Sequence, residues 1–248
     1  MTLYRSELKY FLRSPTIWLI LCLTAFISAW TFLLSIELFT TLQVKFAGMS
    51  DAPTVTQGIL APFISSQAKI LLFVTAIIGG LSFSRLSHHN GWSLLHLSHS
   101  SELTIVRQKY LASLLVCLLF ILPSIVAIAG LTLISHSPLV PILMMVIGLF
   151  LLMMWMLALT MMISSFVNNS GFAILLSLIV LMALLIISQS SLGAEWGKNW
   201  LQTFSPFYHF FQFSQTAIPL ASVCYFIFGV FVFLWVVKVR IVHKRLVL

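Results

Sequence analysis

The sequence predicts an all-α membrane protein with six transmembrane helices in one domain, residues 1–248. Three observations predict this class. The 248 residues are 60% hydrophobic and only 7% charged, whereas soluble domains carry about 25% charged residues. The apolar residues form long runs, and a membrane-spanning helix needs about 20 such residues. Most Pro, Asn and basic residues fall between these runs or beside their ends.

Residues 1–14 are predicted to form an amphipathic helix in the membrane interface. Arg5, Lys9 and Arg13 recur every four residues, and apolar side chains share the other side. Such a helix turns its basic side toward anionic headgroups. An ordinary basic flank of the first span explains the same pattern equally well.

The spans are expected at 16–39, 69–84, 111–134, 139–165, 172–188 and 216–237. Residues 40–67 are expected to be a loop because they contain glycines and prolines, among them Gly58 and Pro62. Residues 135–138 make a tight break, so the third and fourth spans should be antiparallel neighbours. Residues 189–215 are expected to be a mixed loop.

Two patterns inside the spans have competing interpretations. Ala76, Gly80 and Ser84 form a stripe of small residues that permits close helix approach. The stripe can contact a second chain or pack within the subunit. Residues 139–165 contain seven of the ten methionines. Thioethers bind copper, but no Cys or His accompanies them at ligand spacing, which favours lipid-facing positions or adaptable packing.

The charged residues predict an orientation and exclude several functions. With a cytoplasmic amino terminus, ten of the 13 Lys and Arg residues lie on the inner side. The positive-inside rule therefore places both termini and residues 85–109 in the cytoplasm. No carboxylate or arginine is expected at mid-span, which disfavours an ion-driven transporter. No basic groove with aromatic residues suggests nucleic acid as a partner.

No catalytic centre, cofactor or metal site is expected. The acids are scattered over span ends and loops, whereas a lipid-modifying enzyme would need His, Asp or Glu clustered at one interface. His96 and His99 have a spacing that can bind a metal, but an unaccompanied pair at a membrane surface is better interpreted as solvated. The membrane lipids themselves are the one partner that composition implies directly.

The rest of the chain is organised around residues 85–109. This segment is rich in His, Asn, Ser and basic residues, and it keeps one short apolar patch: Trp92, Leu94, Leu95 and Leu97. The patch is too short to cross a bilayer. An apolar anchor ringed by polar residues is typical of an interface hot spot. A surface helix lying among the headgroups is the alternative.

Four motifs carry a resemblance to a known family. They are YRSELKYFLRSP at the start, GWSLLHLSHSSELTIVRQKY from Gly91, ISSFVNNSGFAI, and FSPFYHFFQF near the end. In this order and spacing they resemble the permeases of ABC-2 type transporters, in particular the gliding-motility-type (GldF-like) branch. The chain departs from the family pattern at His88-His89-Asn90, Trp92, Leu94 and Ser100. These departures all fall in the central segment, so either its docking chemistry is expected to be unusual or its partner is expected to be a divergent one.

The resemblance implies the transmembrane domain of an ABC-2, or type V exporter-like, transporter in the inner (plasma) membrane of a bacterial cell. Such a permease exports an amphiphilic or apolar substrate and has no catalytic site. A separate soluble ABC ATPase, expected as a dimer, hydrolyses ATP, and a second permease chain, identical or related, completes the complex.

The same resemblance makes residues 85–109 a coupling segment with a short helix between spans two and three. The residues expected to couple to the ATPase are Gly91, Trp92, Leu94, Leu95, Leu97 and Glu102. Gly91 would permit a sharp turn, and Glu102 would lie in the first turn of the helix that enters span three. The competing functional class is a non-transport anchor or assembly subunit of a membrane complex, which bound haem or a redox partner would favour.

Overall fold

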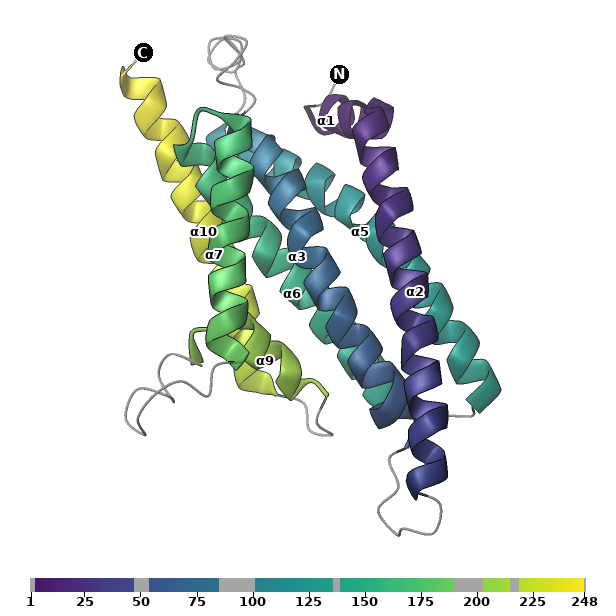
Figure 1. Ribbon diagram of the computed structural model, residues 1–248. Helices are drawn as coiled ribbons and strands as arrows, with labels where there is room; N and C mark the ends of the chain where they lie inside the picture. The colour runs from purple at the N-terminus through teal and green to yellow at the C-terminus, as the bar shows by residue number, and fades with distance from the viewer. Residues whose placement is uncertain are drawn as a thin grey trace.

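Every secondary-structure element in the described part of the chain is a helix (Figure 1). The computed structural model describes residues 3–46, 54–84, 101–135, 139–189, 203–214 and 219–247. The helices are α1 (Leu3–Arg13), α2 (Pro15–Phe46), the π-helical turn η1 (Thr56–Leu60), α3 (Ala61–Ser84), α5 (Glu102–Ser135), α6 (Leu139–Phe166), α7 (Ser170–Gln189), α9 (Pro206–Gln212) and α10 (Leu220–Val247).

Six helices in the described residues are long and apolar enough to cross a membrane. They are α2, α3 with η1 in front of it, α5, α6, α7 and α10. This confirms the predicted all-α class, and the six candidate spans in the described residues agree with the predicted number.

The long helices run side by side, with α3 and α6 at the centre of the bundle (Figure 1). α3 packs against α6, α7 and α5, whereas α6 packs also against α10. α2 lies on the outside, against α3 and α5, and most of its side chains are exposed. The two ends of the chain lie at the same end of the bundle, and α9 lies at the other (Figure 1). We refer to these as the α1 end and the α9 end.

α1 is a separate helix that lies across its end of the bundle (Figure 1). The break falls at Ser14, after which α2 begins at Pro15, a residue suited to a first helical turn. The Trp18 indole nitrogen donates a 2.7 Å hydrogen bond to the Leu12 carbonyl and so fixes the corner. Phe11 is fully buried against the bundle. The three basic residues of the predicted amphipathic helix, Arg5, Lys9 and Arg13, are exposed.

The predicted loop at 40–67 is wrong for residues 40–46, which continue α2, and for residues 55–67, which are helical as well. Pro62 lies inside this continuous helix, directly after the π-helical turn η1, where the regular α-helical bonding pattern is already interrupted. Gly58 lies so close to α2 that an added Cβ would be 2.2 Å from the Phe39 ring. The glycine therefore marks a close approach between helices and not a turn.

The predicted loop at 189–215 is wrong for α9, a two-turn helix. Ser205 precedes it with an extended backbone, and Pro206 occupies its first position, where proline is favoured. Phe207 and Phe210, one turn apart, are buried. A Ser-Pro pair followed by apolar residues at this spacing is a helix signal that a loop assignment overlooks.

Candidate coupling site

The predicted coupling residues Gly91, Trp92, Leu94, Leu95 and Leu97 lie outside the described residues. The structure does place the two helices that flank their segment. α3 ends at Ser84, and α5 begins at Glu102, which opens the helix as the sequence predicts. The Ser101 carbonyl accepts a backbone bond from Ile105 N, and its hydroxyl lies 2.7 Å from that of Thr104.

A buried ion pair lies where these flanks meet α1. The Lys109 ammonium is 2.5 Å from Oε1 of Glu7 and also donates a 2.9 Å hydrogen bond to the Ser82 carbonyl. It lies 5.3 Å from the centre of the Phe83 ring. Lys109 is 1% exposed and Glu7 is 14% exposed. A charge at this depth needs both a counter-ion and hydrogen bonds, so the pair fixes α1, α3 and α5 to one another.

The sequence did not predict this ion pair. The positive-inside rule placed Lys109 in the cytoplasmic segment 85–109, and the sequence offers no sign that Glu7 is near. The residues are 102 positions apart. One signal was available: Glu7 is the single acid on an otherwise basic helix, and so it is the natural partner for a buried cation.

The last turn of α3 is also bonded to α6, through Ser164. The Ser164 hydroxyl donates to the Gly80 carbonyl at 2.8 Å and accepts from the backbone N–H groups of Phe83 and Ser84 at 3.0 Å. Ser82 adds a link to α5, since its hydroxyl lies 3.2 Å from that of Ser113. Side-chain oxygens that bond the terminal turn of a helix hold that turn in place.

Together these residues form a polar cluster at the α1 end of the bundle. We refer to Glu7, Lys109, Ser82, Ser113 and Ser164 as the terminal junction. It joins α1, α3, α5 and α6 beside both ends of the central segment. Because its bonds are directional and buried, a displacement of either flank would be passed to the other three helices. The arrangement suits transmission of motion between these helices.

The stripe of small residues packs within the subunit. A Cβ added at Gly80 would lie 2.8 Å from Cγ1 and 3.0 Å from the Cα of Ile174, on α7. Ala76 and Ser84 are fully buried. At the neighbouring Gly79, a Cβ would meet the Thr160 hydroxyl of α6 at 1.9 Å. Of the two interpretations, the structure therefore favours internal packing over contact with a second chain.

A second polar cluster lies inside the bundle, between α2, α3 and α5. The hydroxyls of Ser28 and Ser124 donate to Oε1 of Gln67, at 2.8 and 2.7 Å. All three side chains are buried, and Nε2 of Gln67 has no hydrogen-bond partner among the described residues. Interhelical bonds of this kind hold membrane helices together. Here they attach α2, most of whose side chains are exposed, to the bundle.

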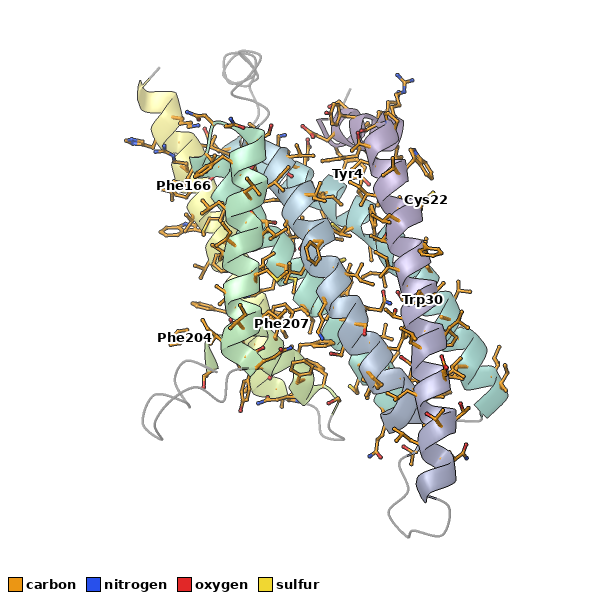
Figure 2. The ribbon with its side chains drawn as sticks, viewed as in Figure 1. Tyr4, Cys22, Trp30, Phe166, Phe204 and Phe207 are labelled. Atoms are coloured by element: carbon orange, nitrogen blue, oxygen red, sulfur yellow. The ribbon has the colours of Figure 1, made fainter. Side chains whose placement is uncertain are left out.

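At the α9 end, His209 is held on both ring nitrogens. Nε2 lies 2.9 Å from the Thr203 carbonyl and therefore carries a proton, whereas Nδ1 lies 3.0 Å from the Ser222 hydroxyl. The ring stacks on Tyr225, with centroids 4.1 Å apart. Burial lowers the pKa of His209, and its hydrogen bond to Thr203 opposes this only in part. Figure 2 labels Phe204 and Phe207 beside this site and Phe166 at the other end of the bundle.

Within the described ranges, no group of three or more His, Cys, Asp or Glu residues could hold a metal ion. Four of the methionines of α6, Met145, Met153, Met156 and Met161, are buried in the core, as the packing interpretation predicts. No family model matches the chain, and no curated protein is significantly similar to it.

Proposed function

We propose that the chain is the membrane-spanning permease subunit of an ABC-2 type transporter. In this proposal it exports an amphiphilic or apolar substrate, and a separate soluble ATPase subunit supplies the energy. The six apolar helices and the four motifs that resemble the family support the proposal. The interior supports it as well: the polar groups at the Gln67 cluster are uncharged, which suits an amphiphile better than an ion.

The terminal junction is the observation that carries the proposal. A coupling segment is useful only if its movement reaches the spans. The two helices that flank the coupling segment, α3 and α5, both take part in a buried network. This network includes the Glu7–Lys109 ion pair and the bonds of Ser164 to α3. In the proposed mechanism, the ATPase seats on Trp92, Leu94, Leu95 and Leu97. Its closure on ATP pushes the ends of α3 and α5, and the junction passes that motion to α1 and α6.

The rest of the proposal concerns assembly and orientation. Two permease chains, identical or related, and an ATPase dimer would form the complex. The α1 end would face the cytoplasm of a bacterial cell, with the protein in the inner membrane. In Figure 1 the two chain termini, the end of α3 and the start of α5 lie on the same side of the bundle, which agrees with this orientation.

The test is to purify the tagged chain from its own host membranes and identify what accompanies it. The proposal expects an ABC ATPase in equal amount, with ATP turnover that the reconstituted permease changes. Haem or a soluble redox protein in place of an ATPase would contradict the proposal and support the anchor or assembly subunit instead.

A further inference from the structure

A groove of about 210 Å³ lies between α5 and α10 near the α1 end. Its described apolar lining is Leu103, Val106, Phe231, Leu234 and Trp235. Val106 forms the buried floor, whereas Leu103 and Trp235 are more than half exposed. The wall is therefore continuous with the lipid-facing surface, and an acyl chain can enter it from the side.

Two cations complete the lining: Arg107 on α5 and Lys238 on α10. No acidic residue is among the described lining residues. Neither cation has an ion pair or a hydrogen bond within the described part of the chain. Lys109, two residues further along α5, has the opposite surroundings, because Glu7 neutralises it. The groove thus combines apolar walls with two positive charges that no described residue pairs.

We propose that this groove binds one anionic phospholipid. An acyl chain lies along Leu103, Phe231 and Leu234, and the phosphate lies between the Arg107 guanidinium and the Lys238 ammonium. Long basic side chains reach from apolar surface to headgroup level, and Trp235 is a residue type enriched at that level. A zwitterionic lipid fills the same walls but carries no net charge to offset the two cations. The proposal goes beyond the transport function, since it requires no ATPase and no cargo.

The test measures lipid retention. The purified chain is equilibrated in detergent micelles with equal amounts of phosphatidylglycerol and phosphatidylcholine, and bound lipids are counted by native mass spectrometry. The expected result is preferential retention of one phosphatidylglycerol. Each basic residue near a headgroup contributes about fivefold in affinity, so Arg107→Gln with Lys238→Gln should lower that retention about thirtyfold. Leu103→Trp, which fills the groove and keeps both charges, should also lower it.

The matched control is Arg5→Gln with Lys9→Gln, which removes the same charge from exposed positions of α1. Retention in this variant should stay within about twofold of the unaltered chain. Equal losses in the two double variants would overturn the proposal, because they would show diffuse attraction only. A second copy of the chain in the groove would also overturn the proposal. The same spectra would then show a dimer that the Leu103→Trp variant loses, while lipid retention stays unchanged.

Discussion

Lys109→Met should destabilise the folded chain strongly, because it removes the cation at the centre of the terminal junction. Glu7 would lose its counter-ion and the Ser82 carbonyl its donor. Removing one partner of a buried pair costs about 3–5 kcal/mol. Glu7 is 14% exposed, so water partly solvates the carboxylate that the substitution leaves behind. We therefore expect Lys109→Met to lower the free energy of unfolding by about 3 kcal/mol. Glu7→Ala removes the carboxylate from the more deeply buried of the two charges and should cost more, about 5 kcal/mol.

The assay is equilibrium unfolding in mixed micelles of increasing dodecyl sulfate, followed by circular dichroism. The double variant Glu7→Ala with Lys109→Met should lose less stability than the sum of the two single changes, by up to about 3 kcal/mol. Lys9→Met, an exposed cation on α1, is the control and should change stability by less than about 0.5 kcal/mol. Additive losses, or a Lys109→Met variant as stable as the control, would refute the assignment of the ion pair.

Three further predictions concern packing, pH and topology. Gly80→Leu should sharply lower the yield of folded protein because its Cβ meets the α7 backbone, whereas Gly130→Leu should not, because nothing lies within 4 Å of a Cβ there; equal yields would contradict the packing of α3 on α7. Burial lowers the pKa of His209, so the unfolded chain binds a proton that the folded chain does not once the pH falls below about 6.5. Stability should therefore fall from that pH downward, and less so in His209→Gln; an unchanged profile would argue against the buried, neutral ring. Cysteines placed at Asp51 and Glu195 should react with an impermeant reagent from the outer side, and labelling from the cytoplasm would refute the predicted orientation.

The class of the protein could be predicted from the sequence because lipid imposes one requirement on every span. Each span must be apolar over about 20 residues and must satisfy its own backbone hydrogen bonds. That requirement is local, so the runs at 16–39 and 139–165 were recognisable directly. The loop prediction for residues 55–67 failed for a different reason. Gly and Pro usually end a helix, but in this segment they occupy positions that the helix tolerates.

The terminal junction could not be predicted in the same way, because its bonds join residues far apart in the chain. Ser164 and Gly80 are 84 positions apart, and Lys109 and Glu7 are 102 positions apart. A serine in an apolar span has many possible partners, including its own backbone. Only the packing of α3 against α5 and α6 selects among them. The sequence singled out the segment between α3 and α5, but none of the bonds of the terminal junction.

The central claim is that residues 91–97 are the seat of an ATPase, and co-purification of that subunit tests it most directly. Leu95→Asp and Trp92→Ala, each made in the tagged chain, should each reduce the ATPase recovered with the permease. Loss of a buried anchor costs about 2 kcal/mol, which is roughly thirtyfold in affinity. Ser98→Asp adds the same charge outside the apolar patch and should retain the ATPase. If both anchor variants retain the partner and its transport-linked ATP turnover, the segment is only a surface helix and the coupling account is contradicted.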